Sequence, residues 1–150
     1  FAAPRTLTSI ETESLAEEVR TFLGGWAAHG DALTAGLTIV ENRFLLVGVD
    51  QASTAPSGCS IDAMVRFLKD YSDRHDIDLV DAPSCCRRTT SGIVCESRES
   101  FASLVVSGAI SDDTTVFDLT AASVGDVREG RFERPFAGSW YEKAFAPVTG

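Results

Sequence analysis

The first part of the chain carries apolar residues at helical spacing. Between residues 8 and 29 they fall on one face of a helix: Ile10, Leu15, Val19, Phe22, Leu23 and Trp26. Thr8 or Ser9 suits the N-cap, and Gly30 is a residue at which helices end. The pattern therefore predicts a first helix over residues 8–29, with His29 at its C-terminal end.

Two apolar runs follow and predict an antiparallel hairpin. They cover residues 33–40 and 43–50, and the turn-forming pair Glu41-Asn42 separates them. The second run is almost wholly apolar. A strand that is buried on both faces has this composition, so the pattern predicts a central place in the sheet for residues 43–50.

The rest of the chain contains both helix patterns and strand patterns. A second helix is predicted over residues 60–74, where Ile61, Met64, Val65 and Leu68 recur at helical spacing. The other predicted elements are a short strand over 78–81, a hairpin of 85–88 with 92–96, a third helix over 97–107, a strand over 114–119, and an irregular tail that packs Phe132, Phe136, Trp140 and Phe145 onto the domain.

This order of elements excludes a fold in which helices and parallel strands alternate throughout. It predicts the α+β class, with a mixed or mainly antiparallel sheet and helices mainly on one face. The 150 residues suit a single domain, and nothing in residues 1–150 resembles a linker or an internal repeat.

Composition narrows the possible partners. The net charge of −9, with no basic stripe, disfavours binding to nucleic acid, whose phosphates a basic surface would have to neutralise. No apolar run approaches the ~20 residues that a membrane-spanning helix needs. We therefore expect no membrane span and no nucleic-acid partner.

The four cysteines are Cys59, Cys85, Cys86 and Cys95. An even number allows two disulfides, but a chain with this many core residues does not need them, and neighbouring cysteines rarely pair with each other. We expect reduced thiols and a cytoplasmic location. Cys85, Cys86 and Cys95 lack C-x-x-C spacing and have no histidine among them, so no metal site is expected.

The segment 56–62 contains the residues best suited to a functional site. It places Cys59 between a predicted strand and a predicted helix, where Gly58 gives backbone freedom and Ser60 can act as the N-cap. Asp62 suits the first turn. The unpaired N–H groups of a helix start attract anions and stabilise a thiolate.

Two functions from different classes fit this segment. In the first, the protein is a non-catalytic binding or interaction domain with a pocket near Cys59 for a small anion or a protein partner. The residues expected at that pocket are Ser57, Gly58, Ser60, Asp50, Trp26 and Arg66. In the alternative, the protein is a thiol-dependent enzyme in which Cys59 is the nucleophile and His29 the base.

Each of these residues also has a structural interpretation. Cys59 can be a small buried thiol at a turn, and Trp26 can be part of the core. Asp50 can cap the loop after its strand, and Arg66 can pair with Asp62 or Asp70 on its own helix. His75 is excluded as a base for Cys59, because a straight helix would separate the two by about 24 Å.

Several segments together resemble a known family. Trp26-Ala-Ala-His-Gly30, Asn42-Arg-Phe44, Asp50 and Ser57-Gly-Cys-Ser-Ile-Asp62 match, in order and separation, an uncharacterised family of small bacterial proteins. Some members carry the label "ABC transporter ATPase". The resemblance continues weakly through residues 113–117 and 137–140. It departs at Tyr141, where the family pattern has histidine. It implies no established activity.

The ATPase label conflicts with the residues present. A P-loop requires G-x-x-x-x-G-K-[ST], so that backbone N–H groups and a lysine hold the phosphates. Neither Lys69 nor Lys143 lies in such a loop, and no G-x-G-x-x-G fingerprint for a dinucleotide is present. We therefore expect no nucleotide cofactor.

The absence of a phosphate-binding loop predicts that the protein neither binds nor hydrolyses ATP. Isothermal titration calorimetry with ATP and magnesium checks this, with heats expected at the level of dilution. Binding in the micromolar range would contradict the prediction.

Overall fold

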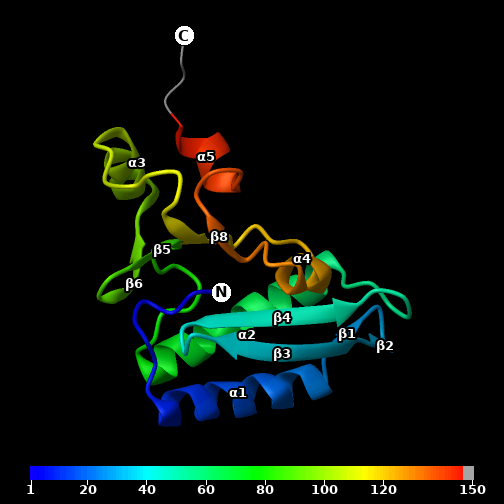
Figure 1. Ribbon diagram of the computed structural model, residues 1–150. Helices are drawn as coiled ribbons and strands as arrows, with labels where there is room; N and C mark the ends of the chain where they lie inside the picture. Colours follow the sequence, from blue (N-terminus) through cyan, green and yellow to red (C-terminus); the bar gives the residue numbers. More distant parts are fainter. Residues whose placement is uncertain (147–150) are drawn as a thin grey trace. The chain divides into compact units, whose positions relative to one another are not determined.

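The computed structural model describes residues 1–146, and the chain divides into two compact units, Phe1–Ala82 and Pro83–Gly150 (Figure 1). Both combine helices with antiparallel strands, which confirms the predicted α+β class and the antiparallel sheet. That residues 1–150 form a single domain stays a prediction.

The first unit contains two longer helices and two hairpins. Its elements, in chain order, are α1 (Ser9–Gly24), β1 (Ala27–Ala28), β2 (Asp31–Ala32), β3 (Thr34–Val40), β4 (Phe44–Asp50) and α2 (Gly58–His75). Strand β1 pairs with β2, and β3 pairs with β4, both antiparallel. The predicted hairpin around Glu41-Asn42 is confirmed. Both turn residues have positive φ angles, 57° and 49°.

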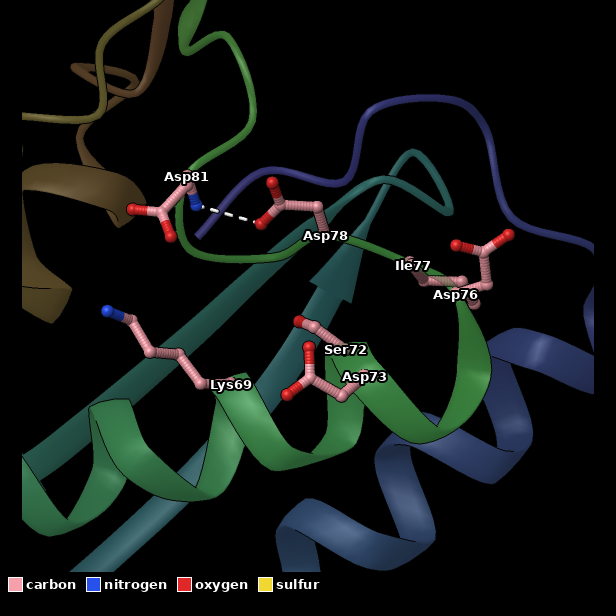
Figure 2. A pocket seen from close by; sticks show the side chains of 7 residues that line it. All are labelled: Lys69, Ser72, Asp73, Asp76, Ile77, Asp78 and Asp81. Atoms are coloured by element: carbon pink, nitrogen blue, oxygen red, sulfur yellow. Dashed lines mark hydrogen bonds between the residues drawn. The ribbon is translucent and has the colours of Figure 1, made fainter.

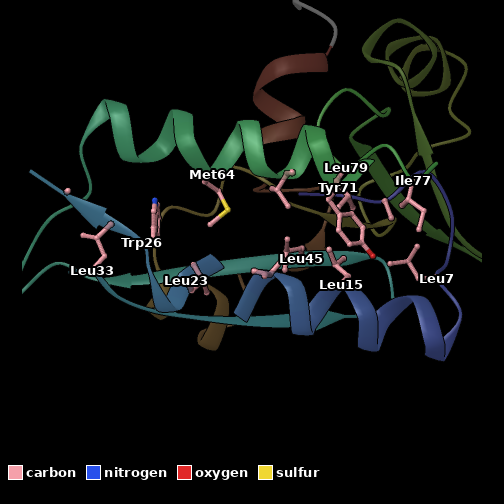
Figure 3. Close-up of a cluster of buried hydrophobic side chains, with 14 residues drawn as sticks. Leu7, Leu15, Leu23, Trp26, Leu33, Leu45, Met64, Tyr71, Ile77 and Leu79 are labelled. Atoms are coloured by element: carbon pink, nitrogen blue, oxygen red, sulfur yellow. The ribbon is translucent and has the colours of Figure 1, made fainter. Parts of the chain in front are cut away.

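Helices α1 and α2 cover one face of the β3–β4 hairpin. The pairs Ala35 with Val49, Leu37 with Val47, and Ile39 with Leu45 lie directly opposite one another and share that face. The same hydrophobic cluster contains Leu15, Val19 and Leu23 of α1 and Met64, Leu68 and Tyr71 of α2 (Figure 3). In this unit the prediction of helices on one face is confirmed.

Helix α1 is shorter than predicted and uses a narrower apolar stripe. It ends at Gly24, with Gly25 as its C-cap, because two consecutive glycines favour helix termination. Ile10 is 80% exposed, so its predicted place in the stripe is wrong. It precedes Leu15 by five residues, and at 3.6 residues per turn this puts it about 140° around the helix.

Strand β4 is not central in a larger sheet. Within the described residues it forms a two-stranded sheet with β3, and its other edge meets only the start of the chain. There Ala2 forms a bridge with Phe44, and the Phe1 amino group donates to the Leu45 carbonyl at 2.9 Å. Phe44 and Leu45 are buried, but residues 46–49 are only partly buried, so the predicted burial on both faces is confirmed only in part. The apolar composition also did not indicate how many strands the backbone pairs with.

The stretch 78–81 is a turn instead of the predicted strand. The Asp78 carboxylate accepts hydrogen bonds from the N–H groups of Val80 and Asp81 at 3.0 and 2.8 Å. An aspartate that bonds the backbone two and three residues ahead favours a turn over an extended strand.

The second unit is built on a four-stranded antiparallel sheet in the order β6-β5-β7-β8. Its elements are β5 (Cys85–Thr89), β6 (Gly92–Glu96), α3 (Arg98–Val106), β7 (Thr115–Phe117), α4 (Val124–Arg128), β8 (Glu133–Pro135) and α5 (Trp140–Phe145). The predicted hairpin, third helix and following strand are confirmed. The predicted irregular tail is wrong in part, because it contains α4, β8 and α5.

A second hydrophobic cluster covers one face of this sheet. Cys85 and Val116 contribute from the strands, Phe101 from α3 and Tyr141 from α5. The Phe101 ring lies 4.9 Å from the Tyr141 ring. The Tyr141 hydroxyl donates to the carbonyls of Ser84 and Phe117 at 3.2 and 2.9 Å.

The expectation of four reduced thiols is wrong. Cys86 and Cys95 form a disulfide, while Cys59 and Cys85 are free. The hairpin register explains the pairing, because Cys86 of β5 lies directly opposite Cys95 of β6. Separately, no helix within residues 1–146 combines the length and the apolar character needed to cross a membrane.

Truncating a buried side chain and an exposed side chain of these helices should change the free energy of unfolding by different amounts. Replacing the fully buried Leu68 with alanine should lower the free energy of unfolding by about 2–5 kcal/mol, because a cavity is left in the core. Replacing the exposed Ile10 with alanine should change it by no more than about 0.5 kcal/mol. Urea unfolding of the two variants measures both values, and equal losses would contradict the packing described.

Candidate site at the start of helix α2

Cys59 lies in the first turn of α2, as predicted. The N-cap is Ser57, three residues earlier than the predicted cap Ser60. The Ser57 hydroxyl accepts from the Ser60 N–H at 3.1 Å, and the Ser60 hydroxyl accepts from the Ser57 N–H at 2.8 Å. This reciprocal capping box makes Gly58 and Cys59 the first two helical residues.

The capping box leaves two backbone N–H donors at the helix start without an acceptor among the described residues. The N–H of Ser60 bonds the Ser57 hydroxyl, and the N–H of Ile61 bonds the Ser57 carbonyl at 3.0 Å. Among residues 1–146, the N–H groups of Gly58 and Cys59 have no acceptor. They are therefore free to bind an acceptor from outside the chain.

Helix α1 differs from α2 at the same position. There Glu11 accepts a hydrogen bond from the N–H of the cap residue Thr8 at 2.9 Å, and Arg5 holds its two carboxylate oxygens at 2.8 Å each. These hydrogen bonds lower the pKa of Glu11 to about 2. The first turn of α2 has no acidic residue, so the predicted first-turn place of Asp62 is wrong. No carboxylate within that turn offsets the partial positive charge of the helix start.

Trp26 joins this helix start to the β1–β2 hairpin. Its indole N–H donates to the Ser60 carbonyl at 2.8 Å, and the side chain is 7% exposed. Figure 3 shows the ring in the core beside Leu33. The core interpretation of Trp26 is therefore confirmed, because the ring packs inside, and its N–H bonds the α2 backbone. A role of Trp26 in ligand binding stays a prediction.

His29 lies in the turn of the β1–β2 hairpin, so its predicted place at a helix end is wrong. His29 and Gly30 have φ angles of 54° and 84°, and a two-residue hairpin turn of type I′ requires two positive φ angles. The imidazole is exposed. Within the described chain it makes no hydrogen bond with Cys59, whose thiol is also exposed.

Asp50 has a structural role at the end of its strand, whereas Arg66 lies away from the start of α2. The Asp50 carboxylate accepts from the Ala52 N–H at 2.9 Å, which confirms its structural role at the end of β4. Arg66 is exposed, and Asp70 pairs with Arg74 at 2.9 Å instead. Arg66 lies seven residues after Cys59, a rise of about 10 Å along the helix. The structure therefore does not bring Arg66 to the first turn.

His75 ends α2 and contacts α1, which confirms its exclusion as a base for Cys59. Its Nε2 atom lies 3.0 Å from a Glu18 carboxylate oxygen, and Arg74 pairs with the same carboxylate at 2.7 Å. These contacts hold α1 and α2 together at the opposite end of the helix from Cys59.

A pocket that the sequence-based prediction missed lies at the C-terminal end of α2. It has a volume of about 380 Å³ and is lined by Lys69, Ser72, Asp73, Asp76, Ile77, Asp78 and Asp81 (Figure 2). The four aspartates within nine residues were its signal in the sequence. They do not form a metal site, because within residues 1–146 no three acidic, histidine or cysteine side chains are placed to hold an ion.

The comparisons with known proteins place no relative beside this chain. No protein-family model, curated protein or solved structure matches it. The resemblance based on the segments around Trp26 and Cys59 stays a prediction. The fold and the site define a small α+β protein. The start of its helix α2 is exposed at Gly58 and Cys59 and has no acidic residue in its first turn.

The Trp26 hydrogen bond predicts a selective effect of removing the indole nitrogen. Trp26→Phe should lower the free energy of unfolding by about 1–2 kcal/mol, through the lost hydrogen bond and a small cavity. Trp140→Phe is the control, since the partly exposed Trp140 indole has no hydrogen-bond acceptor among residues 1–146. Chemical denaturation gives both values, and a loss at Trp140 as large as at Trp26 would count against the bond.

Proposed function

We propose that this protein is a non-catalytic binding or interaction domain, and that it binds anionic groups at the first turn of α2. The observation that carries the proposal is the buried hydrogen bond from Trp26 to Ser60. It fixes the β1–β2 hairpin to the helix start, while the Gly58 and Cys59 N–H groups stay without an acceptor in the described chain. A rigid pair of free donors suits an oxygen anion.

The electrostatics of the helix support an anion over a cation. Helix α2 has 18 residues, and its aligned peptide dipoles place partial positive charge at its start. The first turn has no carboxylate that would cancel this charge. The space beside the Gly58 Cα atom is open, since a Cβ atom at this position would meet no atom within 4 Å outside its own helix backbone and chain neighbours. A phosphate or carboxylate can therefore approach the donors.

The anion can belong to a free small molecule or to an acidic side chain of a protein partner. Both present the same oxygen acceptors to the N–H groups. Inorganic phosphate is a direct probe of this chemistry. Nucleic acid is a poor partner under this proposal, because the net charge of −9 repels its extended backbone.

A charge introduced at residue 59 separates this proposal from nonspecific salt effects. In ¹⁵N NMR spectra at constant ionic strength, phosphate should shift the Gly58 and Cys59 amide signals saturably. Cys59→Glu places a carboxylate in the first turn and should abolish the shift, while raising stability by about 0.3–1 kcal/mol. Cys59→Gln is the matched neutral control and should keep the shift.

Two outcomes would overturn the anion site. One is the absence of any saturable shift with phosphate. The other is an equal response in Cys59→Glu and Cys59→Gln, because binding that ignores a competing carboxylate does not occur at these donors.

The alternative function is a thiol-dependent enzyme with Cys59 as nucleophile and His29 as base. The observation that favours it is the free, exposed thiol at a helix start, on the same end of the first unit as the hairpin that carries His29. Iodoacetamide labelling from pH 5 to pH 9, read by mass spectrometry, separates the two functions. The enzyme requires fast labelling of Cys59 that slows in His29→Ala, whereas the binding proposal expects no effect of His29→Ala.

We also propose a cytoplasmic location. The free, exposed Cys59 supports it, because exposed thiols persist in reducing compartments. The Cys86–Cys95 disulfide is the one observation that points the other way. In a cytoplasmic protein such a bond is usually transient.

A further inference from the structure

The Cys86–Cys95 disulfide lies at the edge of the sheet in the second unit. Strand β6 is the outermost strand and, among residues 1–146, pairs with β5 alone. Cys95 is the fourth of its five residues, and α3 begins two residues after β6 ends. The bond therefore fastens an edge strand to the rest of the sheet.

Strand β5 is held without the help of β6. It pairs with β7 on its other side, through Cys86 with Phe117 and Arg87 with Val116. The residue before it, Ser84, accepts the Tyr141 hydroxyl. On the opposite face from Cys86, the Cys85 side chain is 3% exposed in the core beside Phe101. Loss of β6 would leave these contacts in place.

Besides the disulfide, the contacts that join β6 to β5 include the hairpin ladder, a hydrogen bond from the Thr89 hydroxyl to the Gly92 carbonyl at 2.8 Å, and an ion pair. Arg87 meets the Glu96 carboxylate through two hydrogen bonds of 3.1 Å. The disulfide closes a loop of about ten residues, and cross-linking a loop of this length favours the closed form on the order of 100-fold. Breaking it should therefore free β6 to open.

We propose that the Cys86–Cys95 disulfide is a reversible redox switch that controls the order of edge strand β6. A thiolate of a cellular dithiol attacks the Cys95 sulfur, because Cys95 is partly exposed and Cys86 is 0% exposed. The S–S bond breaks, and Cys86 leaves as a thiolate that takes up a proton. The second thiol of the dithiol then attacks the mixed disulfide, releases Cys95 as a thiol, and forms the oxidised dithiol.

Reduction changes the surface of the second unit. In the oxidised form the β5 edge is covered by β6, and in the reduced form its backbone N–H and C=O groups become available to another strand. This switch does not depend on the anion site of α2, which lies in the first unit. It also accounts for a disulfide in a protein whose proposed location is reducing.

The four cysteines themselves supply the controls for a test on the full chain. The protein is incubated without denaturant in a glutathione buffer of cytosolic composition with a catalytic dithiol, then treated with excess N-ethylmaleimide and analysed by peptide mass spectrometry. Exposed Cys59 reports that the reagent works. Buried Cys85 reports unfolding of the core, and burial also raises the pKa of its thiol.

The proposal expects labelling of Cys59 and Cys95 with Cys85 protected, and an increase on the order of 100-fold in hydrogen exchange of the β6 amides. The double variant Cys86→Ser/Cys95→Ser should show the fast β6 exchange under oxidising conditions as well. If the disulfide stays intact in this glutathione buffer, the bond is structural and the proposed switch is overturned. Labelling of Cys85 would overturn it too, because reduction would then unfold the core, and so would unchanged β6 exchange after reduction.

Discussion

The contact between the β1–β2 hairpin and α2 depends on one buried hydrogen bond between residues 34 positions apart in the sequence. The Trp26 indole donates to the Ser60 carbonyl at 2.8 Å, inside the cluster that α1, α2 and the β3–β4 hairpin share. A buried indole N–H without an acceptor would be costly, so this contact specifies where the β1–β2 hairpin meets α2. The position of the hairpin fixes the surroundings of the Gly58 and Cys59 donors. The proposed function therefore depends on this bond.

Local patterns predicted most of the secondary structure. Apolar runs, turn residues and helical periodicity located β3, β4, α2, α3 and the β5–β6 hairpin, because each of these patterns is set by local sequence. The errors arose where several signals competed. Gly24-Gly25 ended α1 before the apolar stripe did, and His29-Gly30 formed a hairpin turn that helical spacing concealed. The apolar character of β4 could not reveal which partners its backbone pairs with.

The candidate site was predictable only in part. The strand-glycine-cysteine-helix pattern located the start of α2 to within one residue of Cys59, since capping chemistry is local. Contacts between distant segments were not visible. Trp26 was expected on a helical stripe and also at a pocket with Ser60, but nothing local indicates the hydrogen bond that joins the two. The Cys86–Cys95 bond likewise follows from the hairpin register, which the predicted strand ranges did not specify.

Hydrogen exchange of the two indole N–H groups, followed by ¹⁵N NMR, tests the central role of the Trp26 contact most directly. A buried donor in a hydrogen bond exchanges only when its surroundings open. We expect the Trp26 indole to exchange at least about tenfold more slowly than the Trp140 indole, which has no acceptor in the described part of the chain. Equal exchange rates for the two indoles would show that the Trp26 hydrogen bond does not hold the hairpin to α2.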